Sequence, residues 1–275
     1  MFGKKIESKL KNLLLQVSQP VLSKILPFKD IHKGESCYLI GDGVSLKWFD
    51  LKEFSSKISI GIGFVAFHKE FKTLNAKYLM VAEPFWFYPG FWTNNITKSA
   101  SMPDISKAYR NFIEDNQEKK FFLNLSNYPV MRSKNIIYMF RDIKDKRLPV
   151  DFITRRINAF HGTLRSSILL AIYMGFDHCY LVGCDYTHVP SRMHHWYEKG
   201  RGFFSPHENY NKDFFEMAKE YIDITTITLD GASEFINAMT YKNHTGHDTI
   251  YKENWELVDE RYLKVLATFP GYSIY

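Results

Sequence analysis

The chain has 275 residues, of which 45% are hydrophobic and 24% are charged, and its net charge is +6. This length and balance fit one large folded domain, with or without a small lid, and exclude a disordered chain. No run of about 18 apolar residues and no secretory signal occurs, so we predict a soluble cytoplasmic protein with no transmembrane helix. The three cysteines lack CxxC spacing and are predicted to be buried thiols.

Residues 1–33 are predicted to form a basic amphipathic segment. Apolar residues recur there at helical spacing, at Ile6, Leu10, Leu13, Leu14 and Val17. The lysines among residues 1–29 are Lys4, Lys5, Lys9, Lys11, Lys24 and Lys29, against the single acid Glu7. Two interpretations stay open: the helix lies on an anionic surface such as the inner membrane, or it packs on its own domain with solvated lysines. Nucleic acid is not an expected partner, because the other basic residues are scattered.

Residues 34–275 are predicted to form one α/β catalytic domain. Strand-like runs occur at 37–40, 58–62, 78–82, 121–125, 136–140, 179–182 and 224–229. Most are separated by segments of helix length, a pattern that favours a doubly wound, mostly parallel, Rossmann-like sheet.

The clearest helix is predicted at Thr163–Met174, with Thr163 as its N-cap and Gly175 closing it. The polar and aromatic stretch at about 186–208 has no periodicity and exceeds an ordinary connection in length, so we interpret it as an active-site lid.

Two strand-to-helix junctions are candidate binding sites. The first is Gly41-Asp42-Gly43-Val44-Ser45, where amide groups and the Ser45 hydroxyl would meet a phosphate. The second pairs the helix start Gly162-Thr163 with Asp185 at the end of a strand. Either could also be a plain turn or cap without a ligand.

The lid contains His188, His194, His195 and His207, among which one could act as a general base. Their spacing matches no standard zinc pattern, so no metal is expected. The aromatic run 83–92 is either a wall for stacking a sugar or base, or a hydrophobic plug under the lid.

The first junction, GDGVSLKWFD, resembles the G-N-G-P-S-L-K-x-x-D turn of the bacterial sialyltransferases of glycosyltransferase family 42. Their T-S-G segment, helix, L-G-Y and I-Y-L-x-G-x-D-F-Y strand are similar in order and spacing to Gly162-Thr163, Met174-Gly175-Phe176 and the strand 180–186. A broader group, the 6-hydroxymethylpterin pyrophosphokinase-like domains, shares the same turn and helix-strand-Asp unit. The resemblance implies a variant of the GT-A fold.

The resemblance also implies a CMP-linked nonulosonic acid as donor, a bacterial surface glycan such as lipopolysaccharide or capsule as acceptor, and no obligatory metal cofactor. The donor-binding residues carried over are Gly41, Asp42, Gly43, Ser45, Gly162, Thr163 and Asp185. Tyr186 or Tyr197 would have to stabilise the departing nucleotide in place of the family's phosphate-binding tyrosine. The base matches His207 by its distance to a helix predicted at 209–221, with His195 as the alternative.

This sequence departs from the family at three positions, where Asp42 and Gly63 replace asparagines and Thr187 replaces a tyrosine. A carboxylate at Asp42 would repel donor phosphates. One alternative is therefore an Mg²⁺-dependent pyrophosphokinase with Asp42 and Asp185 as metal ligands. A second alternative is a nucleotide-binding module without turnover, and a homo-oligomer is compatible with each.

Overall fold

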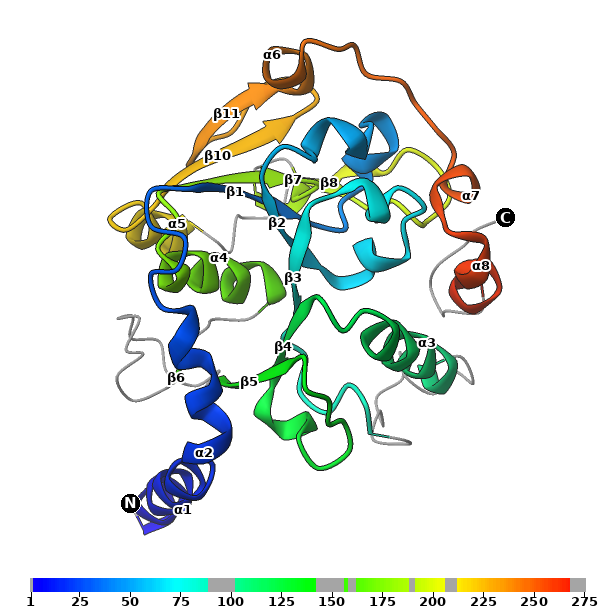
Figure 1. Ribbon diagram of the computed structural model, residues 1–275. Coiled ribbons are helices and arrows are strands. Elements are labelled where there is room, and N and C mark those ends of the chain that lie inside the picture. Colours follow the sequence, from blue (N-terminus) through cyan, green and yellow to red (C-terminus); the bar gives the residue numbers. More distant parts are fainter. Residues whose placement is uncertain are drawn as a thin grey trace.

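The computed structural model describes residues 2–88, 102–141, 156–157, 162–187, 191–205 and 212–267. Within these ranges, nine parallel strands form the central sheet, in the order β11-β10-β7-β1-β2-β3-β4-β5-β6 (Figure 1). They are β1 Ser36–Ile40, β2 Ile58–Ile62, β3 Ala76–Val81, β4 Lys120–Asn124, β5 Ile136–Arg141, β6 Arg156–Ile157, β7 His178–Val182, β10 Asp223–Thr228 and β11 Asn237–Thr240. A separate antiparallel pair consists of β8 Ser191–Met193 and β9 Phe203–Ser205. The predicted doubly wound α/β fold is confirmed.

Helices flank the sheet (Figure 1). The α-helices are α1 Phe2–Val17, α2 Gln19–Leu22, α3 Met102–Asp115, α4 Thr163–Met174, α5 Lys212–Ala218, α6 Tyr241–Thr245, α7 Asn254–Leu257 and α8 Glu260–Ala267. The 3-10 helices are Ser23–Phe28, Val44–Trp48, Leu51–Phe54, Gly63–Phe67, Phe71–Thr73, Leu125–Asn127 and Asp185–Thr187.

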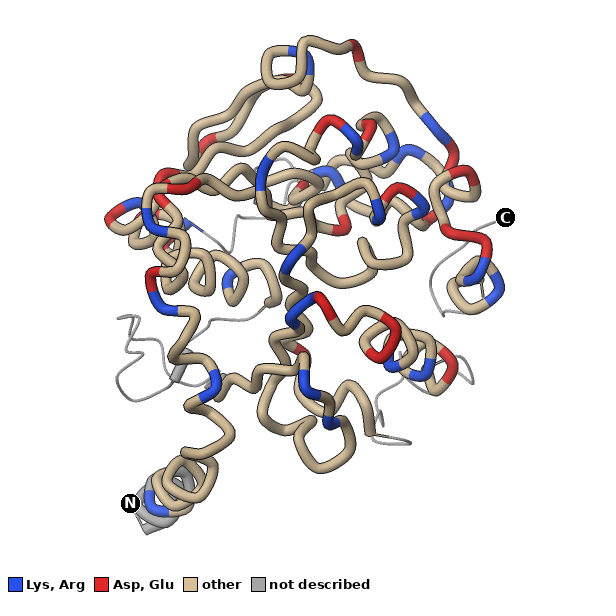
Figure 2. Tube along the Cα trace, in the orientation of Figure 1, with Lys and Arg blue, Asp and Glu red and all other residues tan. Residues whose placement is uncertain are grey.

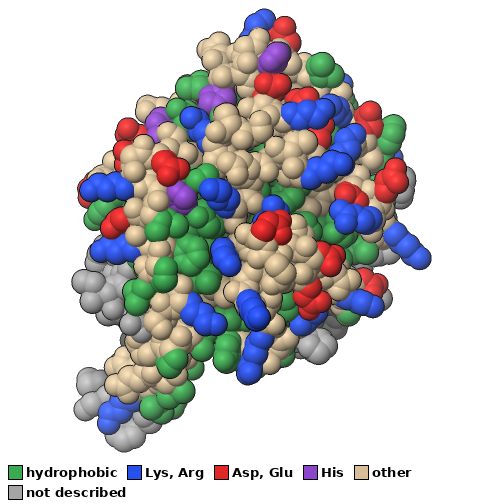
Figure 3. Space-filling model, viewed as in Figure 1, with side chains coloured by type: hydrophobic (Ala, Val, Ile, Leu, Met, Phe, Trp, Pro, Cys, Tyr) green, Lys and Arg blue, Asp and Glu red, His purple; other side chains and the backbone are tan. Residues whose placement is uncertain are grey.

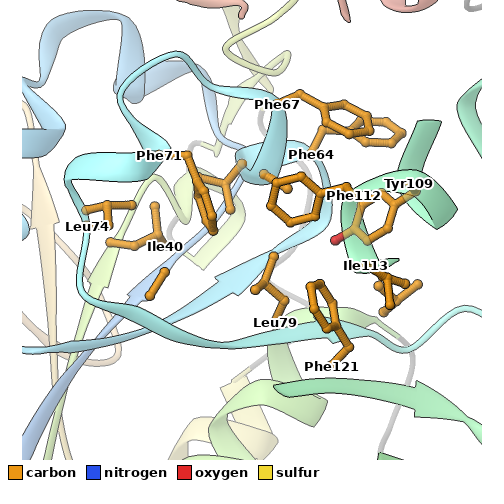
Figure 4. Close-up of a cluster of buried hydrophobic side chains, with 14 of the residues drawn as sticks. Ile40, Phe64, Phe67, Phe71, Leu74, Leu79, Tyr109, Phe112, Ile113 and Phe121 are labelled. Carbon is orange, nitrogen blue, oxygen red and sulfur yellow. The ribbon is translucent and has the colours of Figure 1, made fainter. Parts of the chain in front are cut away.

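Both faces of the sheet are buried. In β1, Cys37 and Leu39 belong to one apolar cluster, together with α4 and α5, while Tyr38 and Ile40 belong to another. Strand side chains alternate between faces, so a strand buried on both sides reads as a continuous apolar run. The second cluster is rich in aromatic rings, several of which meet edge to face around Phe67 (Figure 4). Phe, Tyr and Trp make up 16% of the chain, and many of these side chains therefore serve packing.

The sequence predictions of regular structure can be compared element by element. The seven predicted strands are confirmed with ends within two residues, whereas β6, β8, β9 and β11 were not foreseen. Helix α4 has the predicted bounds, and Gly175 closes it in the left-handed conformation as expected. The prediction that Thr163 is the N-cap is wrong: Gly162 occupies that position, with φ 104°, and supplies no side-chain cap.

The continuous helix at the amino terminus is shorter than the predicted range 1–33. Helix α1 ends at Val17, and the chain then turns through α2 and the 3-10 helix Ser23–Phe28, where Leu22 and Ile25 are buried. The three cysteines are buried thiols, as predicted. Among the described residues, none of the helices combines the length and apolar character needed to cross a membrane.

Candidate functional site

The winding of the sheet reverses between β1 and β7. From β1 the order continues through β2 to β6 in one direction and through β7, β10 and β11 in the other. The residues that follow β1 pack on one face, whereas α5, which follows β7, packs on the other. In open α/β sheets, ligands bind beside the carboxyl ends of the strands at such a switch point.

A cavity of about 770 Å³ lies at this point. Its lining residues are Gly41, Asp42, Gly43, Ile62, Gly162, Thr163, Leu164, Arg165, Gly183, Cys184, Tyr186 and His195. The two junctions that the sequence indicated, 41–45 and 162–163, therefore meet at one cavity. Its volume is typical of small-molecule sites in proteins.

The amide groups of the first junction have other partners than a phosphate. Gly41 N–H donates to the Val182 carbonyl at 2.8 Å, and Gly43 N–H donates to the Gly183 carbonyl at 2.7 Å. Ser45 N–H donates to Asp185 Oδ2 at 2.7 Å. These bonds join the ends of β1 and β7 so closely that a Cβ atom on Gly43 would lie 2.3 Å from that same oxygen. The prediction that these three amides hold phosphate is corrected: they, and the glycines, serve the strand junction.

Three other predicted donor-binding residues lie outside the cavity lining. Ser45 is buried, and its hydroxyl has no hydrogen-bond partner among the described residues. Asp185 is buried and caps the Ser45 amide. Tyr197 is buried, with its ring against Phe64 and His195. Their positions indicate support of the site from beneath, whereas Tyr186 lines the cavity itself.

The second junction brings the positive end of a helix to the cavity. Residues Gly162 to Arg165 line it, and the first amides of an α-helix have no partner within the helix. Their aligned dipoles favour an anion at this end. The Thr163 hydroxyl donates to Glu83 Oε1, and Arg165 also lines the cavity, with its guanidinium group over the Phe214 ring of α5. The start of α4 is therefore suited to attract an anion, with the Glu83 carboxylate as a neighbouring negative group.

Asp42 places a carboxyl group in the cavity wall. Its Oδ2 accepts from Phe64 N–H at 2.8 Å, and its Oδ1 accepts from the Trp196 indole at 3.4 Å. Burial raises the pKa of Asp42 to about 6, opposed by the nearby His195. A Cβ atom on Gly63 would lie 1.9 Å from Oδ2, so the departures at positions 42 and 63 are structurally linked.

His195 forms a pair with a glutamate that the sequence analysis did not single out. The Glu198 carboxylate accepts from the His195 backbone amide at 2.6 Å and lies 3.3 Å from its Nδ1. The ring stacks on Tyr197 with an angle of 8° between the planes. A carboxylate at Nδ1 places the ring proton there and the lone pair on Nε2, the arrangement of an oriented general base. The His-x-x-Glu spacing in HHWYEKG was the available signal.

Glu83 and Arg165 were also missed as site residues. Glu83 lies just beyond β3 and accepts a hydrogen bond from the Thr163 hydroxyl, while Arg165 lies in the first turn of α4. Only the folded sheet brings the ends of β3 and β1 to the same edge.

The segment predicted as a lid is anchored in its middle. Trp196 is fully buried, and its backbone amide donates to the Asp42 carbonyl at 3.1 Å. The buried Lys47 ammonium donates to the carbonyl oxygens of Glu198 and Gly200. Opening and closing of this segment stays a prediction. His207, with the range 206–211, and His188 lie outside the described residues.

The described part of the aromatic run packs into the protein. Phe87 is buried, and Trp86 packs against the same apolar cluster. This favours a hydrophobic plug for residues 85–88, while residues 89–92 lie outside the described ranges.

Among the residues that the structure describes, no group of three or more His, Cys, Asp or Glu side chains is arranged to hold a metal ion. The Asp42 and Asp185 pair of the kinase alternative is not assembled at the cavity, since the Asp185 carboxylate caps Ser45.

Comparisons with known proteins gave matches only among solved structures; no protein-family model and no curated protein matches the sequence. The MAf glycosyltransferase from Magnetospirillum magneticum AMB-1 aligns with a TM-score of 0.47 and 13% identity, over 88% of this chain and 40% of that chain. The sialyltransferase CstII from Campylobacter jejuni with CMP-3FNeuAc gives 0.42 and 15%, over 84% and 98%. The sialyltransferase CST-II with a trisaccharide acceptor and CMP gives 0.37 and 15%, over 85% and 100%.

Proposed function

We propose that this protein is a glycosyltransferase that takes a sugar from a nucleotide donor. One observation carries the proposal: a cavity at the switch point is lined both by the anion-attracting start of α4 and by His195, whose Nδ1 contacts Glu198. The first can hold a departing phosphate, and the second can deprotonate an acceptor hydroxyl.

The charges in the cavity orient the donor. We place its phosphate at Gly162–Arg165, because the first amides of a helix attract an anion, whereas Asp42 brings a carboxylate to the cavity lining. A carboxylate repels phosphate but accepts hydrogen bonds from hydroxyl groups. Asp42 is therefore assigned to a ribose or sugar hydroxyl of the donor.

The proposed reaction requires only that protein groups be held in position around the reacting atoms. Nε2 of His195 takes the proton of the acceptor hydroxyl, whose oxygen bonds to the anomeric carbon as the bond from that carbon to the phosphate oxygen breaks, with inversion. Glu198 stabilises the imidazolium formed. The amides of α4, with Arg165 and Tyr186, stabilise the leaving nucleotide phosphate.

For the donor we propose a CMP-linked nonulosonic acid, and for the acceptor a bacterial surface glycan. Support comes from the resemblance of GDGVSLKWFD and of the Gly162-Thr163 block to the family 42 sialyltransferases. Residues of both motifs line the cavity described above. His207 remains the second candidate for the base.

A thermal-shift panel tests this function. CMP, CDP, UDP, GDP and ATP are each added with and without Mg²⁺, since a ligand that binds the folded state raises its melting temperature. We expect a shift with CMP that is independent of Mg²⁺. A shift only with ATP and Mg²⁺ would instead identify a pyrophosphokinase. CMP binding without transfer to any glycan acceptor would identify a binding module.

A further inference from the structure

Helix α1 exposes one apolar face. The side chains of Leu10, Leu13, Leu14 and Val17 are 62%, 57%, 49% and 70% exposed. Leu15, on the other side of the helix, is 8% exposed and belongs to the core cluster. The helix thus contacts its own domain through Leu15, while the domain leaves the other four side chains exposed.

The exposed residues form a continuous stripe. At about 100° per residue, Leu10, Leu13, Leu14 and Val17 fall within an arc of about 100°. On the same reckoning the position of Lys9 follows that of Leu13 at one border of the stripe, and the positions of Glu7 and then Lys11 follow that of Leu14 at the other. Lysines at the border between the apolar and polar faces are typical of helices that lie in a membrane interface.

The position of α1 leaves this stripe accessible. The helix extends away from the sheet at the lower left of Figure 1 and Figure 2, and hydrophobic side chains gather over it and the adjoining segment in Figure 3.

We propose that α1 docks this protein on an anionic lipid surface, through the stripe Leu10, Leu13, Leu14 and Val17. The net positive charge of α1 favours an anionic lipid surface over other partners for the stripe. Lysines outnumber acids on the helix, with Lys4, Lys5, Lys9 and Lys11 against Glu7. A second copy of the chain would bring these positive charges together, whereas anionic headgroups neutralise them while the acyl region receives the leucines. The inference is independent of the proposed transferase activity.

Vesicle co-sedimentation of the full chain tests the proposal. We expect binding to vesicles of phosphatidylcholine with phosphatidylglycerol, and at least tenfold weaker binding to phosphatidylcholine alone. The double variant Leu10→Ser, Leu14→Ser should reduce binding at least tenfold. The matched control is Asn12→Ser, Gln16→Ser, two exposed positions on the polar side of the same helix, and it should bind like the parent protein.

All substituted side chains are exposed, so the melting temperatures of both double variants should equal that of the parent protein. Equal binding of the leucine variant and its control would overturn the proposal, as would failure of the parent protein to bind anionic vesicles. Dimerisation that the leucine substitutions abolish, without vesicle binding, would assign the stripe to a second copy instead. Nucleotide binding is measured separately and tests the proposed function alone.

Discussion

Asp42 is the residue whose chemistry departs most from the site that the sequence predicts. It brings a carboxyl group to a cavity where an anionic donor is expected, yet it is held by Phe64 N–H and the Trp196 indole. Gly63 provides the space for it. Because its pKa is raised only to about 6, the group is largely ionised at neutral pH and should steer phosphate toward α4.

The raised pKa of Asp42 predicts a pH-dependent stability. The folded state favours the protonated carboxyl, so its stabilising contribution is full below pH about 4 and is lost as the pH rises through about 6. Asp42→Asn avoids this loss, which is on the order of 1–3 kcal/mol. We compare the melting temperature of Asp42→Asn with that of the parent protein. We expect this difference to favour the variant by several degrees more at pH 7.5 than at pH 4.5. An equal difference at both pH values would contradict this account.

The His195–Glu198 pair predicts a kinetic result. His195→Ala should lower kcat by roughly 10² to 10⁴, the usual contribution of a general base, and change CMP affinity by less than about threefold. Glu198→Gln keeps the size of the side chain but removes its charge, so it should lower kcat because the imidazolium formed in the reaction loses its stabilising partner. His207→Ala is the matched comparison. Normal turnover in His195→Ala with loss in His207→Ala would assign the base to His207.

At the scale of elements, the segment 194–202 depends on one buried lysine. The ammonium group of Lys47 holds the carbonyl oxygens of Glu198 and Gly200, and burial lowers its pKa to about 8. Lys47 follows the first junction directly in the chain. The turn at 41–45 and the segment with the proposed base are therefore one mechanical unit.

Lys47→Met should loosen this unit. The thioether fills similar space but donates no hydrogen bond, so two buried carbonyl groups lose their partner. We expect faster amide hydrogen exchange at 194–202, by tenfold or more, with little change in α4. Lys52→Met, at an exposed lysine of the next turn, is the control and should leave exchange unchanged. Unaltered exchange at 194–202 in Lys47→Met would refute the anchoring role.

At the scale of the whole molecule, the reversal of strand order places the cavity. The β1 and β7 ends meet there through hydrogen bonds between residues about 140 positions apart in the sequence, such as Ser45 and Asp185. The chain after β1 covers one face of the sheet, and α5 covers the other. The divergence of these connections is what leaves room for a ligand.

The sequence by itself determined the seven main strands, helix α4 with its closing Gly175, and the parallel sheet class. These follow from local periodicity and from the backbone preference of glycine, which act over a few residues. The sequence also indicated the two strand-to-helix junctions at 41–45 and 162–163, and it included His195 among the candidate bases.

Only the tertiary structure decided the strand order, the meeting of both junctions at one cavity, and the partners of individual groups. It assigned the Ser45 amide to Asp185, Nδ1 of His195 to Glu198, and the leucine stripe of α1 to the surface. The physical reason is that a hydrogen bond or a buried contact depends on which distant segments the sheet brings together. A pattern of residues along the chain carries no record of that pairing.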